Sequence, residues 1–142
     1  MSTKKIFMFF IVFLIVIAST SIASAADDTV TVGGIDFKLP DGFTENSTYS
    51  DTAFEQNHEI ERDFNTYVNG NDEIQFYVKT SVDGTEYTDL EPGNEDVEKT
   101  IGNVTGYYNS DIDGLKCFTY IEDGKMVSIL TTDDDYFSEV MM

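Results

Sequence analysis

Short runs of alternating hydrophobic and polar residues, separated by turns that contain glycine, are the feature that most constrains this chain. Alternation with a period of two places every second side chain on the same side of a β-strand. The strongest pair of runs covers residues 115–121 and 126–131, which flank the dipeptide Asp123-Gly124. Asp-Gly between two such runs is typical of a two-residue β-hairpin. The pattern therefore predicts a sheet of antiparallel hairpins.

Three further pairs of runs follow the same rule. They are residues 29–32 with 35–39 around Gly33-Gly34, residues 60–68 with 74–80 around Asn69-Gly70, and residues 97–101 with 104–108 around Gly102-Asn103. We predict no regular element for the polar residues 43–57. We expect the acidic residues 83–96 to form a long surface loop, because they contain Pro92-Gly93 and lack alternation.

The end of the chain departs from the period of two. Tyr136, Phe137, Val140 and Met141 recur at helical spacing after three aspartates, which can stabilise the N-terminus of a helix. Both faces of the 115–131 hairpin are apolar, and such strands are typically buried on both sides. The prediction is an α+β fold: an antiparallel β-sheet of hairpins with a short C-terminal helix packed on it.

The first 25 residues differ from the rest in composition. Lys4 and Lys5 precede an apolar run from Ile6 to Ala18, and Ala23-Ser24-Ala25 follows. This layout is typical of a secretory signal, here with an N-terminal hydrophobic helix. The apolar run would span only about 20 Å of the roughly 30 Å of hydrocarbon in a bilayer. We predict a cleaved signal peptide at residues 1–25, with an uncleaved anchor as the alternative.

All 27 acidic residues lie beyond position 26. Without residues 1–25 the chain keeps six basic residues, and its formal charge becomes −21. Nucleic acid and anionic bilayers would repel such a surface, so we expect neither as a partner, apart from membrane contact through an uncleaved N-terminal segment. Residues 26–142 are predicted to form a single acidic, β-rich domain that is secreted or exposed at the cell surface.

Residue types that support catalysis or metal binding are scarce. His58 is the only histidine and Cys117 the only cysteine, so one chain cannot build a histidine-rich zinc site or an internal disulfide. A Cys117–His58 dyad is conceivable, with Cys117 on one strand and His58 at the start of another, although a thiol on an apolar strand is usually inert. No phosphate-binding loop or serine elbow is present, and no two carboxylates stand out for glycoside hydrolysis. We predict no catalytic residue and no cofactor.

One segment is similar to a calcium-binding loop. Asn109, Asp111 and Asp113 precede Gly114 with the alternate spacing of the first half of an EF-hand. The twelfth position is Tyr120 where a bidentate glutamate is required, so we favour a plain turn. A calcium-binding surface protein is the alternative.

Two Asn-X-Thr sequences, at Asn46 and Asn103, are candidates for glycosylation in an exported protein. Asn46 lies in the irregular stretch and is the better acceptor, whereas Asn103 lies in a predicted tight turn.

Four tyrosines form the candidate binding face. In each predicted strand, the tyrosine projects from the face whose residues are polar or mixed in character; the four are Tyr67, Tyr77, Tyr107 and Tyr120. If those strands are neighbours, the four rings form a stripe on one sheet face that can stack on a sugar or another protein. The alternative, which we favour, is cross-strand pairing beneath the C-terminal helix.

Residues 34–43, 101–108 and 118–125 carry a resemblance to known proteins. With these turn-and-strand segments, most of the chain after residue 25 resembles small exported proteins of methanogenic archaea that have no assigned activity. More loosely, it resembles the open antiparallel sheets of PsbP- and Mog1-like domains, which serve as binding scaffolds. The resemblance implies the fold class and an extracellular destination, and it carries no catalytic residue.

The most consistent hypothesis is therefore a non-enzymatic protein of the cell envelope or extracellular space that binds an envelope component or a polysaccharide. A hydrolase of cell-wall or extracellular polymers is the alternative. The sequence indicates neither the ligand nor the oligomeric state.

Overall fold

A computed structural model describes residues 28–142, and the predicted signal segment lies outside them. The elements in chain order are β1 (Asp28–Val32), β2 (Ile35–Leu39), β3 (Thr44–Glu45), the 3-10 helix η1 (Ser47–Tyr49), β4 (Asp51–Glu55), β5 (Ile60–Asn69), β6 (Asp72–Ser81), β7 (Val97–Ile101), β8 (Val104–Ile112), β9 (Leu115–Glu122), β10 (Lys125–Thr131) and α2 (Asp135–Val140). The fold is mainly antiparallel β-sheet with one short C-terminal helix, as predicted.

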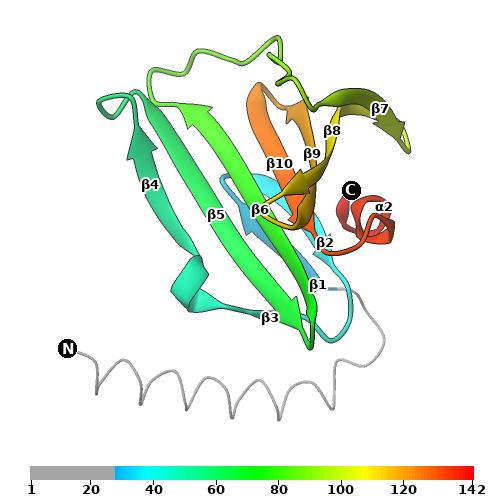
Figure 1. Ribbon diagram of the computed structural model, residues 1–142. Helices are drawn as coiled ribbons and strands as arrows, with labels where there is room; N and C mark the ends of the chain where they lie inside the picture. Colours follow the sequence, from blue (N-terminus) through cyan, green and yellow to red (C-terminus); the bar gives the residue numbers. More distant parts are fainter. Residues whose placement is uncertain (1–27) are drawn as a thin grey trace, which may run out of the picture.

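An eight-stranded sheet dominates the structure (Figure 1). Its strand order is β3-β5-β6-β10-β9-β8-β7, and β4 also pairs with β5. The β1–β2 hairpin forms a separate two-stranded sheet. All four predicted hairpins are confirmed as antiparallel pairs. In the strongest of them, Asp123 and Gly124 have φ angles of 51° and 71°, as a tight two-residue turn requires.

Residues 43–57 contradict the prediction of an irregular stretch, because they contain β3, η1 and β4. The side chain of Asn46 accepts a hydrogen bond from the backbone N–H of Thr48, and the Ser50 hydroxyl donates to the Asn46 carbonyl. These bonds turn the chain at η1, so that β4 runs beside β5. Most side chains of β3 and β4 are exposed at the sheet edge, which explains why the segment lacks hydrophobic alternation.

Residues 83–96 contain no strand or helix, as predicted for a long surface loop. The loop crosses the end of the β9–β10 hairpin, where the Tyr87 N–H donates to the Gly124 carbonyl at 2.8 Å.

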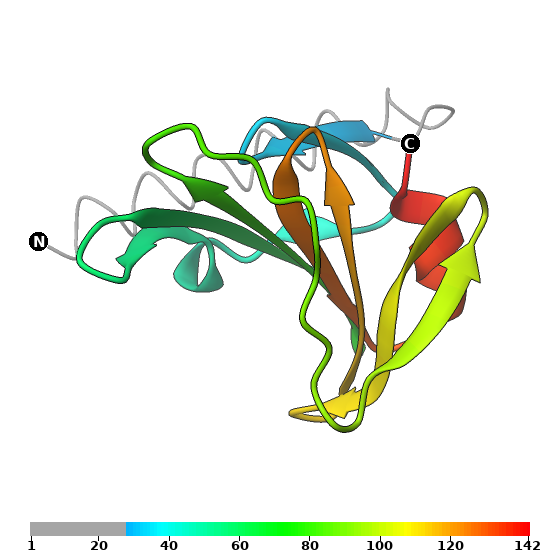
Figure 2. The same cartoon turned by 90° about the horizontal axis from the view of Figure 1, so that it is seen from above.

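The β1–β2 hairpin and α2 cover the same face of the large sheet (Figure 2). Phe37 of β2 stacks on Phe76 of β6, with ring centroids 4.2 Å apart, and Phe137 of α2 packs against Phe118 of β9. The side chains buried between these layers form the hydrophobic core: Val32, Ile35, Phe37, Leu39, Phe43, Tyr67, Ile74, Phe76, Val78, Phe118, Tyr120, Val127, Ile129, Phe137 and Val140.

The opposite face of the sheet is not covered in the way that the sequence predicts. Cys117, Ile121 and Leu130 lie on this face and are only half-buried, because the helix shares the other face with the hairpin. The expectation that the β9–β10 hairpin is buried on both sides is therefore wrong.

Two tyrosine hydroxyls connect α2 and the turn before it to the sheet, and they predict a response to alkaline pH. Tyr108 donates to Asp134 and Tyr136 donates to Asp72, each at 2.8 Å. Burial, followed by the bond to Asp134, raises the pKa of Tyr108 to about 12, and the bond to Asp72, followed by burial, raises the pKa of Tyr136 to about 12.

A raised pKa in the folded state means that this stabilisation is complete below pH 10 and is lost as the pH rises through 12. We expect tyrosinate absorbance and the loss of β-sheet circular dichroism to rise together between these values. In Tyr136→Phe the alkaline loss of stability should be shallower. Tyrosinate absorbance that rises without any change in circular dichroism would contradict this coupling.

Candidate functional site

The face of the large sheet opposite the β1–β2 hairpin and α2 carries three consecutive rows of side chains that form the candidate site, which we call the open face. The loop of residues 83–96 lies against part of this face, since Tyr87 lines the pocket and Asn109 of β8 donates to Asp96 at 2.9 Å. Within the described residues, no hairpin or α-helix packs on it, and η1 lies at its edge (Figure 2). Each row contains residues that face one another across neighbouring strands, so its members project from the same side of the sheet.

The first row, which we call the aromatic row, crosses five strands. Its members, in spatial order from β5 to β8, are Phe64, Tyr77, Ser128, Thr119 and Tyr107. All five are half-buried. The rings of Phe64 and Tyr77 are stacked with centroids 5.4 Å apart, and the hydroxyls of Thr119 and Ser128 share a hydrogen bond of 2.8 Å. With strands about 4.8 Å apart, the row is roughly 19 Å long.

The second row contains two basic residues, Arg62 and Lys79, which we call the cationic pair. They face each other across β5 and β6, one step along the strands from Phe64 and Tyr77. Both contact the carboxylate of Glu55, Arg62 at 3.1 Å and Lys79 at 3.2 Å. One carboxylate thus serves two cations, which leaves an excess of one positive charge in this cluster.

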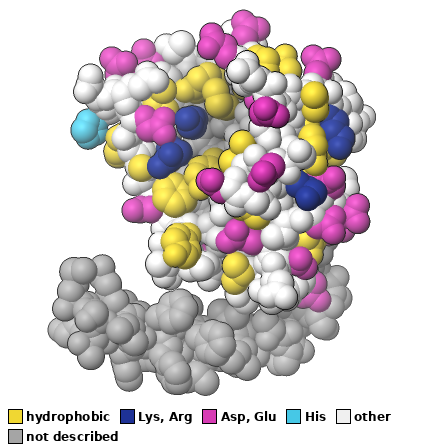
Figure 3. Space-filling view, viewed as in Figure 1, with side chains coloured by type: hydrophobic (Ala, Val, Ile, Leu, Met, Phe, Trp, Pro, Cys, Tyr) yellow, Lys and Arg dark blue, Asp and Glu magenta, His cyan; other side chains and the backbone are white. Residues whose placement is uncertain are grey.

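Arg62 is the only arginine in the chain. Its guanidinium carbon lies 5.3 Å from the ring centroid of Phe64 and 5.9 Å from that of Tyr77. Such stacking holds the guanidinium in place. Its Nη1 donates to Glu55, so Nη2 is the outer nitrogen that can donate to a further group. Its Nε atom is buried without a hydrogen-bond partner among the described residues. Figure 3 shows basic and hydrophobic side chains together on this face, beside acidic ones.

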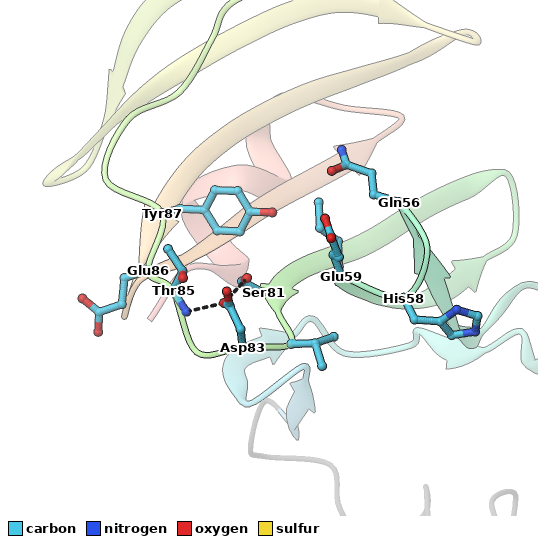
Figure 4. A pocket seen from close by; sticks show the side chains of 10 residues that line it. Gln56, His58, Glu59, Ser81, Asp83, Thr85, Glu86 and Tyr87 are labelled. Atoms are coloured by element: carbon cyan, nitrogen blue, oxygen red, sulfur yellow. Dashed lines mark hydrogen bonds between the residues drawn. The ribbon is translucent and has the colours of Figure 1, made fainter.

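The third row begins at Ile60 and Ser81 and continues into a pocket of about 500 Å³ (Figure 4). The pocket lies between the β4–β5 turn and the loop after β6. Its lining residues are Gln56, His58, Glu59, Ile60, Ser81, Val82, Asp83, Thr85, Glu86 and Tyr87. The ring of Tyr87 points across the opening, whereas His58 points away from it.

Asp83 is held in the pocket wall by its own neighbours. Its carboxylate accepts hydrogen bonds from the Thr85 N–H at 2.9 Å and the Ser81 hydroxyl at 2.7 Å. The bond from Thr85, followed by the one from Ser81, lowers the pKa of Asp83 to about 2. At neutral pH this group is an ionised acceptor, and it cannot supply the proton that a glycosidase acid donates.

The structure separates the four tyrosines of the predicted binding face. Tyr77 and Tyr107 lie in the aromatic row, but Tyr67 and Tyr120 are 5% and 3% exposed on the covered face. The four rings therefore do not share one face of the sheet, and the stripe that we considered but did not favour does not form. Tyr67 faces Ile74 across β5 and β6, and this register directs it into the core.

The side chains of the calcium candidate close a turn. The Asn109 side-chain oxygen accepts from the Asp111 N–H, and the Asp111 carboxylate accepts from the Gly114 N–H. Asp113 is exposed, with a φ of 52° in the β8–β9 turn. Among residues 28–142, no group of three or more histidine, cysteine, aspartate or glutamate side chains is arranged to hold a metal ion.

The catalytic candidates are far apart. Across the sheet, Cys117 is in register with Thr66 of β5. His58 precedes the first residue of β5, so roughly 20 Å of that strand separates it from the level of Cys117. Burial raises the pKa of the Cys117 thiol, which disfavours the nucleophilic thiolate. The charge of Asp63 raises the pKa of Glu61, but both residues have the strand parity of the covered face. The geometry thus assembles no nucleophile–base pair at the open face.

The two glycosylation candidates are at different places on the surface. Asn103 is exposed in the β7–β8 turn, whereas Asn46 is half-buried and caps η1 with its side chain.

Sequence reasoning missed Glu55, Arg62, Phe64 and Lys79 as site residues. The sequence contained a signal for three of them. In two runs predicted to pair, Arg62 lies two residues from Phe64 and Lys79 lies two residues from Tyr77, so each basic residue shares a sheet face with its aromatic neighbour. Glu55 had no such signal, since its strand was not predicted.

Comparisons of the chain with protein-family models, with curated proteins and with solved structures found no match. Within residues 28–142, no helix has the length and apolar character needed to cross a membrane.

Proposed function

We propose that this protein is a non-enzymatic binding module, exported to the cell envelope or the extracellular space, and that it holds its ligand on the open face. The observation that carries the proposal is the adjacency of the aromatic row and the cationic pair on the sheet face that no hairpin or α-helix of the described residues covers. Tyrosine and arginine are the side chains most often responsible for binding energy at protein interfaces.

The energetics of this face support binding. Five side chains of the aromatic row are half-buried, so a ligand can remove the rest of their surface from water without any rearrangement of the sheet. The row and the cationic pair stand on regular strands of the sheet, which hold side chains more firmly than loops do. The ordering cost of binding is correspondingly small.

Co-sedimentation tests the use of this face. The purified protein is mixed with insoluble envelope polymer from the producing cells, stripped of protein, and the bound fraction is measured across concentrations. We expect the double variant Tyr77→Ala/Tyr107→Ala to bind at least about tenfold more weakly than the wild type. The matched control is Phe54→Ala, which removes a ring that is 50% exposed and has the opposite strand parity. Equal binding by all three proteins, with intact folds by circular dichroism, would refute the proposal.

Export and glycosylation have their own measurement, the intact mass of the protein recovered from producing cells. We expect the mass of residues 26–142, increased by glycans that Asn46→Gln or Asn103→Gln removes one at a time. The mass of the unmodified full chain would contradict both expectations.

A further inference from the structure

We infer that the ligand of the open face is a glycan that carries carboxylate groups, with its sugar rings on the aromatic row and one carboxylate on the cationic pair. The inference rests on the proposed function, because it assigns a chemical class to the ligand of the same face.

The charges on this face favour an anionic group. Arg62 and Lys79 share the single carboxylate of Glu55, so the cluster retains one positive charge in a chain of formal charge −19. The guanidinium of Arg62 is stacked near two rings. Its Nη1 donates to Glu55 and its Nε is buried, so a ligand carboxylate would accept from Nη2 and from the Lys79 ammonium. A ligand carboxylate would complete a cluster of two cations and two anions.

The neighbouring rows favour a sugar as the carrier of that carboxylate. Two hydroxyl side chains, Ser128 and Thr119, lie between the ring of Tyr77 and the ring of Tyr107 in the aromatic row. Sugar rings present C–H groups on their faces and hydroxyls at their edges, so rings and hydroxyls together are complementary to them. The row of roughly 19 Å accommodates several linked sugars. Beyond the cationic pair, the pocket adds further hydroxyl and carboxylate acceptors from Ser81 and Glu59.

An acidic peptide fits this face less well. Peptides that add to sheets gain affinity from backbone hydrogen bonds along a free strand edge. The rows of the open face are built on paired strands of the sheet, whose backbone groups bond to neighbouring strands. The face therefore offers side chains alone, which suits a glycan.

The acidity of the chain limits the charge density of the ligand. Glu59, Asp83 and Glu86 line the pocket beside the cationic pair and oppose a further carboxylate there. Only a carboxylate that reaches Arg62 and Lys79 themselves is therefore favoured, whereas acids more than about 8 Å away are largely screened at physiological ionic strength. A densely charged polymer that spread over the remaining surface would be repelled. We therefore expect short or sparsely carboxylated glycans to bind best.

Calorimetric titration with three matched probes tests the inference. The probes are trigalacturonate, its fully methyl-esterified form, which has the same sugars without the charges, and the peptide triglutamate, which has the carboxylates without the sugars. The protein is purified from cells that express the full chain. We expect trigalacturonate to bind at least about tenfold more tightly than either control, with an affinity that falls as salt is raised.

Three variants locate the effect. We expect Arg62→Gln and Lys79→Gln each to weaken trigalacturonate binding about 10- to 100-fold and to leave binding of the ester unchanged. Glu55→Gln should tighten trigalacturonate binding severalfold, because it removes the competing carboxylate. Since this variant gains affinity, damage to the fold cannot imitate the result. Lys38→Gln, an equal charge change on the outer side of the β1–β2 hairpin, should have no effect.

The outcomes separate the two proposals. Equal binding of trigalacturonate and its ester, or no tightening in Glu55→Gln, would overturn the carboxylate inference, as would triglutamate binding as tightly as trigalacturonate. If no probe binds while envelope polymer still binds through Tyr77 and Tyr107, the inference fails and the proposed function stands. If envelope polymer also binds independently of those tyrosines, both fail.

Discussion

Replacement of Phe37 by alanine is expected to lower the free energy of unfolding by about 3 to 5 kcal/mol, a large part of the stability of a domain of this size. Phe37 is fully buried and stacks on Phe76, so it is a main contact between the β1–β2 hairpin and the large sheet. The side chain cannot be replaced by water, because the cavity would be lined by hydrocarbon. Chemical denaturation of both proteins, followed by far-ultraviolet circular dichroism, measures the difference.

The matched control for this prediction is Phe54→Ala. Phe54 is also a strand phenylalanine, but it is 50% exposed on β4, and we expect its loss to cost less than about 1 kcal/mol. Equal destabilisation by the two substitutions would mean that the hairpin does not depend on Phe37 for its packing. A change in the denaturant slope of Phe37→Ala would indicate that the hairpin separates from the sheet before the rest unfolds.

The hairpins were predictable because their signals are local. A two-residue turn with positive φ angles needs Gly or Asp-Gly, and the alternation on either side identifies the strands. The short helix was predictable for the same reason, since three aspartates precede residues at helical spacing. Each of these features is determined by residues that are neighbours in the sequence.

The faces of the sheet were not predictable, because they depend on contacts between distant segments. β6 pairs with β10, although a 15-residue connection and three strands lie between them in the chain, and no local signal specifies that register. In β5, Phe64 and Tyr67 project from opposite faces of the strand, and each face carries apolar residues. The pairing of Tyr67 with Ile74 decides which parity enters the core. The candidate site follows from this choice, since it places Arg62 and Phe64 on the open face.

A second substitution with a large expected effect is Gly106→Ala in β8. Gly106 is buried, and a Cβ atom there would overlap the backbone carbonyl oxygen of Thr119 and lie 3.1 Å from Cζ of Phe118. A backbone atom in the middle of a sheet cannot rotate away as a flexible side chain does, so β8 itself would have to move from β9. We expect a loss of about 3 kcal/mol or more, at the upper end of what overpacking costs.

Gly102→Ala isolates the effect of packing from the general effect of replacing a glycine. Gly102 has a φ of 61° and nothing within 4 Å of an added Cβ, so its replacement should cost about 1 to 2 kcal/mol through backbone strain alone. Because Tyr107 follows Gly106 and pairs with Thr119, movement of β8 would also displace one end of the aromatic row. Gly106→Ala should therefore weaken binding to envelope polymer even at temperatures where it remains folded, whereas Gly102→Ala should not. If the two variants melt at the same temperature and bind equally well, the close approach of β8 to β9 is not what holds Tyr107 on the open face.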